Sequence, residues 1–311
     1  MKIVVIGIFP EAAQARIRQS FPSDWQVCIV PPPAAEAVLS DADIVVPEHI
    51  SVDRPFLEKA PRLRLVQTGA GYDNVDIEAC TERGIYVCNA AGINAAAVAE
   101  HVMALILCWY KNIAYLDSFM KSRGKEGELS YSGGELAGKT IGIIGLGHIG
   151  QKLAGCCKAF DMTVLGCGHK PLDIPGVELV EPDQLYARSD IVSVHVPLLP
   201  STRHMIDSAV FSRMKPSALL VNTARGAIIN EADLIEALRT HTIAGACLDV
   251  YEQEPLSEDS PLRDLPNVIL TPHTAGLPDS VRFHQKRYDF FRANIIKVMN
   301  NEKPDSALNT V

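Results

Sequence analysis

The sequence has 311 residues, of which 47% are hydrophobic and 21% charged, and its net charge is −8. This length and composition are typical of a globular protein with about two domains of ~100–200 residues each. The net negative charge and the lack of a basic run argue against nucleic-acid binding. No apolar run reaches the roughly 18 residues that a membrane span needs.

Residues 1–92 alternate between strand and helix patterns. Strands are predicted at residues 3–6, 25–30, 43–46, 63–67 and 85–88, and helices at 11–19 and 35–39. This alternation predicts an α/β lobe with a parallel sheet covered on both faces. Because Gly7 stands alone after the first strand, the lobe lacks a phosphate-binding fingerprint. We therefore expect it not to bind a nucleotide.

Residues 94–121 predict one long helix, which the side chain of Asn94 would cap. The helix is apolar nearly all round, so we expect it to be buried between lobes or against a second subunit.

The segment from Thr140 to Gly150 predicts a buried strand that runs into a glycine turn and then a helix. Gly145, Gly147 and Gly150 fit the G-x-G-x-x-G fingerprint. The first glycine permits a tight turn, the second lets the backbone approach a pyrophosphate, and the third lets helix and strand pack closely. The start of the helix offers N–H groups to phosphates, so we predict a dinucleotide site here.

Five further strands are predicted at residues 162–166, 190–196, 218–222, 243–248 and 268–270. With the strand before Gly145 they make six, which matches a doubly wound nucleotide-binding domain. A last helix at residues 280–300 is expected to return to the first lobe, because the second sheet is already complete.

Three charged or titratable residues, Arg225, Glu254 and His273, come just past strand ends in the second half of the chain. Taken singly, they suggest a surface arginine, a solvated glutamate and a packed histidine. Open α/β sheets bind ligands outside the carboxyl ends of their strands. Three such residues at equivalent positions therefore indicate a site.

Several motifs together resemble the D-isomer-specific 2-hydroxyacid dehydrogenase family. They are Gly145–Gly150, His195–Leu198 with Thr202, Asn222–Gly226, Leu248–Val250 with Glu254-Pro255, and Thr271–His273. The resemblance runs from Gly69 to Gly276 and implies two doubly wound parallel-sheet domains with a cleft between them. A Rossmann cofactor domain at residues 93–276 would be inserted into a flavodoxin-like substrate domain at residues 1–92 plus 277–311. It also implies homodimers built on the cofactor domains and the helix after Asn94.

The resemblance implies roles for the matching residues. Arg225 would hold the substrate carboxylate with its guanidinium fork, and His273 would be the acid–base, with Glu254 hydrogen-bonded to it and favouring imidazolium. The implied cofactor-binding residues are Gly145, Gly147, His148, Ile149, Gly150, Gly168, His169, Lys170, Val196, Pro197, Thr202, Thr223, Ala224, Asp249, Ala275 and Gly276. Asp249 would face the nicotinamide amide, and the implied substrate-binding residues are Ala70, Gly71, Tyr72 and Asn94.

Departures from the family narrow the substrate. Formate dehydrogenases carry glutamine where Glu254 stands, and phosphonate dehydrogenases carry lysine where Ala70 stands, so formate and phosphite are disfavoured. A small 2-oxo acid such as glyoxylate or hydroxypyruvate is predicted. One alternative is a phosphoglycerate-type dehydrogenase, without a regulatory domain, which would need Arg62 or Arg64 to hold a phosphate. Another is a non-enzymatic dinucleotide-sensing module on the same scaffold.

The cofactor preference rests on one position. NAD-specific members need an acidic residue at the end of the second strand, about twenty residues beyond the fingerprint, for the ribose 2′-OH. Gly168 stands there, followed by His169 and Lys170. We therefore predict NADP as the preferred cofactor and NAD as possible; the alternative is an exposed turn that tolerates either.

Eight cysteines lie mostly in apolar segments without metal-ligand spacing, which predicts reduced core residues of a cytoplasmic protein. Of the remaining histidines, His101 is expected to pack within its helix, His195 to lie near a strand end, and His204 and His284 to be at the surface. His49 follows a strand in the first lobe and is a further candidate to face the substrate.

Overall fold

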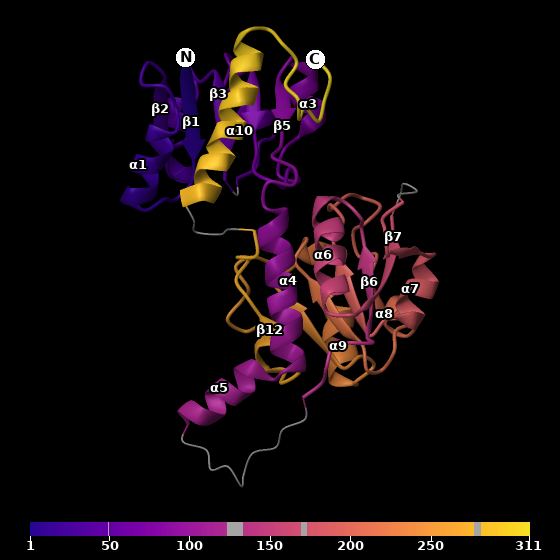
Figure 1. Ribbon diagram of the computed structural model, residues 1–311. Coiled ribbons are helices and arrows are strands. Elements are labelled where there is room, and N and C mark those ends of the chain that lie inside the picture. The colour runs from indigo at the N-terminus through magenta and orange to yellow at the C-terminus, as the bar shows by residue number, and fades with distance from the viewer. Residues whose placement is uncertain (49, 123–132, 169–172, 277–280) are drawn as a thin grey trace. The chain divides into compact units, whose positions relative to one another are not determined.

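The computed structural model describes residues 1–48, 50–122, 133–168, 173–276 and 281–311, and the chain divides into two compact units (Figure 1). The first unit comprises Met1–Ile93 with Asp279–Val311, and the second comprises Asn94–Pro278. Each contains one all-parallel sheet, so the predicted α/β class with two parallel sheets is confirmed. Among the described helices, none has the length and apolar character needed to cross a membrane.

The sheet of the first unit has five strands in the order β2-β1-β3-β4-β5. They are β1 (Lys2–Ile6), β2 (Gln26–Val30), β3 (Ile44–Pro47), β4 (Leu65–Gln67) and β5 (Tyr86–Cys88). Along β1, Val4 and Ile6 pack into one hydrophobic cluster and Ile3 and Val5 into another. This alternation buries both faces of the sheet, as a parallel sheet requires.

Helices cover both faces of this sheet. Helices α2 (Arg54–Glu58) and α3 (Ile77–Glu82) contribute to one cluster, and α1 (Glu11–Gln19) and α10 (Val281–Met299) to the other. Tyr288, Phe291 and Ile295 of α10 are fully or nearly fully buried there, so the expected return of the last helix is confirmed. The helix expected at residues 35–39 is wrong. Two short 3₁₀ turns, η1 (Pro32–Ala34) and η2 (Glu36–Val38), occupy that region, and the N–H groups of Ala35 and Val38 bond to carbonyl oxygens three residues earlier.

The sheet of the second unit has seven strands in the order β12-β11-β10-β9-β6-β7-β8. They are β6 (Thr140–Ile144), β7 (Thr163–Cys167), β8 (Glu178–Leu179), β9 (Ile191–Val194), β10 (Leu219–Asn222), β11 (Gly245–Leu248) and β12 (Val268–Leu270). Six of these match the predicted strands. Strand β8 was not predicted, because two exposed residues carry no alternation pattern. The order reverses at β6 and β9, where doubly wound sheets bind ligands.

Two helix layers enclose this second sheet. On one face lie α4 (Ala95–Tyr110) and α6 (His148–Ala159), and on the other α7 (Pro182–Arg188), α8 (Ser208–Phe211) and α9 (Glu231–Arg239). Short 3₁₀ turns η4 (Gly226–Ile228) and η5 (Pro261–Asp264) follow β10 and precede β12.

The single helix expected at residues 94–121 is wrong. The chain forms α4 and a separate α5 (Ile113–Lys121), and Asn112 between them adopts a left-handed conformation with φ of 53°. Asparagine tolerates this conformation better than most residues, and one such residue ends a helix. The apolar pattern continues across the break, so it gives no sign of it.

Candidate active site

The turn between β6 and α6 has the geometry that its three glycines predict. Gly145 has a positive φ of 95°, and a Cβ there would lie 2.4 Å from the carbonyl oxygen of His195. A Cβ on Gly150 would lie 2.1 Å from the carbonyl oxygen of Gly145, so only glycine lets α6 pack this closely. A Cβ on Gly147 would meet nothing within 4 Å, which leaves open space in front of the turn.

Helix α6 begins at His148 without a side-chain cap from Gly147. The first N–H groups of a helix have no partner within it, so His148, Ile149 and Gly150 present donors at a positive helix end. Gly168 follows β7, and a Cβ there would lie 3.8 Å from the nitrogen of Leu146. His169 and Lys170 lie outside the described residues.

Hydrogen bonds of Thr202 hold the loop after β9 in its conformation. The hydroxyl of Thr202 donates to the carbonyl oxygen of Pro197 at 2.7 Å and accepts from the N–H of Leu199 at 2.8 Å. Thr202 therefore shapes this loop, which also carries Val196. His195 lies at the end of β9 as expected, with Nε2 2.8 Å from the hydroxyl of Ser193.

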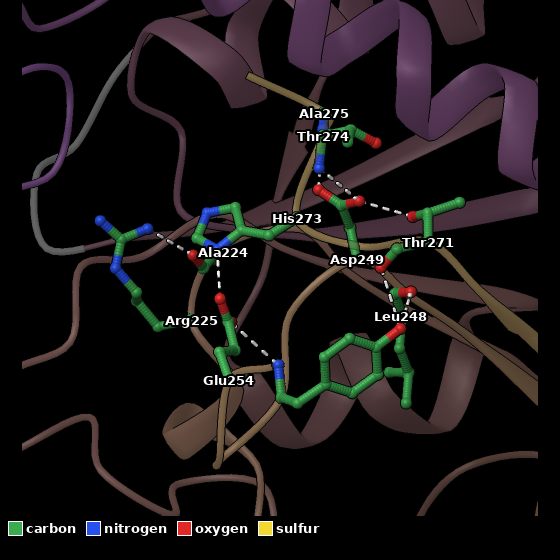
Figure 2. Close-up of polar contacts among 10 residues, drawn as sticks. Ala224, Arg225, Leu248, Asp249, Glu254, Thr271, His273, Thr274 and Ala275 are labelled. Atoms are coloured by element: carbon green, nitrogen blue, oxygen red, sulfur yellow. Dashed lines mark hydrogen bonds and ion pairs between the residues drawn. The ribbon is translucent and has the colours of Figure 1, made fainter. Parts of the chain in front are cut away.

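The loop after β10 positions Arg225. The side chain of Asn222 accepts from the N–H of Ala224 at 3.0 Å and donates to the carbonyl oxygen of Arg225 at 2.9 Å, which fixes the turn. The guanidinium of Arg225 donates to the carbonyl oxygen of Ala224 at 2.7 Å (Figure 2). Thr223, next to it, is buried, and its hydroxyl has no hydrogen-bond partner among the described residues.

Glu254 and His273 form a direct pair. Nδ1 of His273 lies 2.5 Å from a carboxylate oxygen of Glu254, whose other oxygen accepts from the N–H of Tyr251 at 3.1 Å. Burial raises the pKa of Glu254, but the hydrogen bond and charge of His273, the Tyr251 N–H and the charge of Arg225 together outweigh it and lower that pKa overall. Arg225, Glu254 and His273 therefore come together within one unit (Figure 2).

Asp249 holds the turn that carries His273. Its carboxylate is fully buried and accepts from the N–H groups of Thr274 at 2.9 Å and Ala275 at 2.8 Å, and from the hydroxyl of Thr271 at 2.5 Å. His273 has a left-handed φ of 53°. This conformation is uncommon for a residue with a side chain, and the bonds from Asp249 to the two residues after His273 help to hold it.

Asn94, at the start of the second unit, and Gly276, in the loop after β12, are two further predicted site residues. A Cβ on Gly276 would lie 2.6 Å from the amide nitrogen of Asn94, so the two residues are neighbours. The expected cap is wrong, because the Asn94 side chain makes no capping hydrogen bond to α4. Its oxygen is instead buried without a partner among the described residues.

The predicted substrate loop belongs to the first unit and follows β4. The carbonyl oxygen of Ala70 accepts from the side chain of Asn89 at 3.0 Å, and that of Tyr72 accepts from the N–H of Val75 at 3.1 Å. Gly71 lies between them. His49 lies outside the described residues. Sequence reasoning missed His101, whose ring contacts Thr271 and Asp249 and is not merely packed in its helix.

Comparisons with known proteins agree on one family. The model of the D-isomer specific 2-hydroxyacid dehydrogenase NAD binding domain matches residues 103–275. The glyoxylate reductase of Thermofilum pendens is 34% identical over 99% of this chain and 94% of its own length. A solved acyclic imino acid reductase in complex with NADPH and D-Arg is 31% identical, with a TM-score of 0.86, and the match covers 99% of this chain and 100% of that chain. The chain belongs to the D-isomer-specific 2-hydroxyacid dehydrogenase family.

Members of this family are NAD(P)-dependent enzymes. The D-3-phosphoglycerate dehydrogenase of Archaeoglobus fulgidus is 43% identical over 75% of this chain, but the match covers only 45% of that enzyme. The chain thus spans about half the length of this relative.

The residues present fit an NAD(P) dinucleotide. The glycine turn leaves room that a side chain would fill, and uncapped N–H groups point out of the start of α6. The buried Thr223 hydroxyl has a hydrogen-bonding capacity that no described residue uses.

Proposed function

We propose that this protein reduces a small 2-oxo acid of the glyoxylate or hydroxypyruvate type to the D-2-hydroxy acid with NADPH. The observation that carries the proposal is the gathering of Arg225, His273 and Glu254 on three loops at one edge of the sheet (Figure 2). Three side chains of these types supply a carboxylate-binding fork, a proton donor and a carboxylate that orients it.

Each residue has a task that follows from its contacts. Arg225, held by the turn after β10, binds the substrate carboxylate and polarises the carbonyl. Glu254 holds Nδ1 of His273 and so orients the ring, and Nε2 is the nitrogen that would give its proton to the carbonyl oxygen. The bound nicotinamide supplies the hydride. The glycine turn would hold the pyrophosphate, and Thr223 and Asp249 would lie at the nicotinamide end.

The contacts of two arginines in the first unit argue against a phosphorylated substrate. Arg62 pairs with Asp43 at 3.0 Å, and Arg64 donates to the carbonyl oxygen of Val298 at 2.6 Å and the side chain of Asn301 at 2.7 Å. Both guanidinium groups are already engaged within the first unit. This supports an unphosphorylated 2-oxo acid over a phosphoglycerate-type substrate.

The test measures the reduction of glyoxylate, hydroxypyruvate, pyruvate and phosphohydroxypyruvate. The rate with each acid is read from the loss of absorbance of the reduced nicotinamide. The highest kcat/KM is expected for glyoxylate or hydroxypyruvate. A higher kcat/KM for phosphohydroxypyruvate would overturn the substrate class. Tight dinucleotide binding without turnover of any acid would instead support a dinucleotide-sensing module.

The preference for NADPH rests on Gly168. No carboxylate stands at this position to repel a 2′-phosphate or to bind a 2′-OH. The space around Gly168 admits a side chain, so Gly168→Asp is a direct test. We expect wild type to favour NADPH and Gly168→Asp to favour NADH. A wild-type advantage for NADH would overturn the preference. The neighbouring His169 and Lys170 remain candidates for binding the phosphate.

A cytoplasmic homodimer is part of the same proposal. Helix α5 has no buried residue, and Ile113, Tyr115 and Met120 are 53%, 44% and 71% exposed. An apolar surface of this kind favours association with a second copy. The eight free thiols suit a reducing compartment. Light scattering of wild type and Met120→Glu tests the dimer, and we expect the variant to shift toward monomer.

A further inference from the structure

The ring of His101, on α4, reaches the loop that carries the proposed acid–base residue. Its Nε2 lies 3.1 Å from the hydroxyl oxygen of Thr271 and 3.6 Å from a carboxylate oxygen of Asp249. His101 comes from a different layer of the second unit than the loops of Arg225 and Glu254. Its contact with Thr271 therefore ties α4 to the end of β12.

The directions of these hydrogen bonds follow from proton counting. The hydroxyl of Thr271 has one proton, which it donates to Asp249. Its oxygen therefore accepts from His101, so Nε2 of His101 must carry a proton. The result is a chain of donors that runs from His101 through Thr271 to Asp249.

The end of this chain is the carboxylate that fixes the His273 turn. Asp249 accepts from the N–H groups of Thr274 and Ala275, the two residues after His273, while Thr271 precedes it by two. A buried carboxylate with several donors is held in one orientation, and the loss of one donor leaves it free to reorient. The orientation of Asp249 in turn affects the left-handed backbone of His273.

We propose that His101 is a positioning residue of the dehydrogenase reaction. Through Thr271 and Asp249 it holds the turn at His273, so that the ring meets Glu254 and faces the substrate carbonyl. This inference rests on the proposed function, because it takes His273 as the proton donor. The contacts of the His101 ring go to Thr271 and Asp249, and Figure 2 shows how Asp249 meets Thr271 and the turn after His273.

Matched variants separate this role from simple packing. His101→Gln places an amide N–H near the position of Nε2, whereas His101→Phe keeps the ring and removes the donor. Thr271→Val keeps the shape of the side chain and removes the hydroxyl that links His101 to Asp249. We expect His101→Phe and Thr271→Val each to lower kcat about tenfold, as the loss of roughly one hydrogen bond predicts. The KM of the 2-oxo acid should change little, and His101→Gln should recover most of the lost kcat.

The double variant His101→Phe/Thr271→Val gives the sharpest result. If His101 acts only through the hydrogen bond to Thr271, the kcat of the double variant equals that of Thr271→Val alone. If each acts independently, the losses multiply, and the proposal is overturned. Equal kcat for His101→Phe and wild type would also overturn it, as would equal losses in the Phe and Gln variants.

A second measurement uses the protein without cofactor or substrate. The amides of Thr274 and Ala275, which bond to Asp249, should exchange hydrogen more slowly in wild type than in His101→Phe, with His101→Gln close to wild type. Unchanged exchange in His101→Phe contradicts the positioning role. A wild type that reduces no 2-oxo acid refutes the proposed function, whereas active wild type with an equally active His101→Phe refutes only this inference.

Discussion

At the scale of single residues, His273 has the contacts of a proton donor. Removing a general acid typically costs ~10²–10⁴-fold in rate. We therefore expect His273→Ala to lower kcat by this factor while the Kd of the dinucleotide stays nearly unchanged. Steady-state kinetics and fluorescence titration measure the two quantities.

A second histidine–glutamate pair in the same unit supplies the control. His204 lies 2.8 Å from Glu252, and its side chain is 41% exposed. His204→Ala removes an imidazole and its contact with Glu252 but should leave kcat at the wild-type value. A His273→Ala variant as active as His204→Ala would show that His273 is not the donor.

His195 predicts a pH dependence of stability. Burial lowers its pKa from 6.5 to about 4. Below pH 6.5 the unfolded chain binds a proton here that the folded chain binds only near pH 4, so the free energy of unfolding falls over this range. We expect denaturant titrations to show a smaller fall for His195→Gln than for wild type. Parallel curves for the two proteins would contradict this assignment.

Site residues that belong to a sequence motif could be predicted from the sequence. Residues whose contacts depend on how distant elements pack together could not. The contact between Glu254 and His273 was expected from the family resemblance, and the structure contains it. His101 has no motif, and its contact with Thr271 exists only because α4 packs on the sheet. The Asn94 cap was mispredicted for a similar reason, because the amide lies against Gly276 and not against the start of its helix.

At the scale of elements, helix α6 contains two glycines with opposite surroundings. A Cβ on Gly150 would meet the backbone of Gly145, whereas a Cβ on Gly155 would meet nothing within 4 Å. Gly150→Ala should force α6 away from β6 and greatly weaken dinucleotide binding. Gly155→Ala should leave binding intact and stabilise the helix by up to about 1 kcal/mol. Isothermal calorimetry and thermal unfolding compare them, and equal dinucleotide affinities would refute the close-packing role of Gly150.

Buried strands were predictable as elements, and short or bent segments were not. Strands such as β6 and β10 are continuous apolar runs because both of their faces are covered. The break at Asn112 depends on one backbone conformation, and the edge strand β8 on pairing with Leu165 and Gly166 of β7. Neither feature changes the local apolar pattern, which is the signal that sequence reasoning uses.

At the scale of the whole molecule, the hydrophobic clusters divide as the two units do. Two clusters consist of residues of the first unit alone, and two of residues of the second unit alone. The chain between Asn94 and Pro278 is continuous and includes all seven strands of its sheet. A unit with its own core and a complete sheet is expected to fold by itself.

We therefore expect a fragment of residues 94–278 to unfold cooperatively on heating and to bind NADPH. Dinucleotide at 100 times its Kd should stabilise this fragment by about 2.7 kcal/mol, because only the folded state binds it. The fragment should not reduce any 2-oxo acid, since the proposed substrate loop at Ala70–Tyr72 is missing. Circular dichroism with and without NADPH measures the stabilisation, and the same fragment with Gly150→Ala is the control that should show none. A fragment that is unfolded at every temperature, or one that turns over substrate as fast as the full chain, would show that this division of fold and function is wrong.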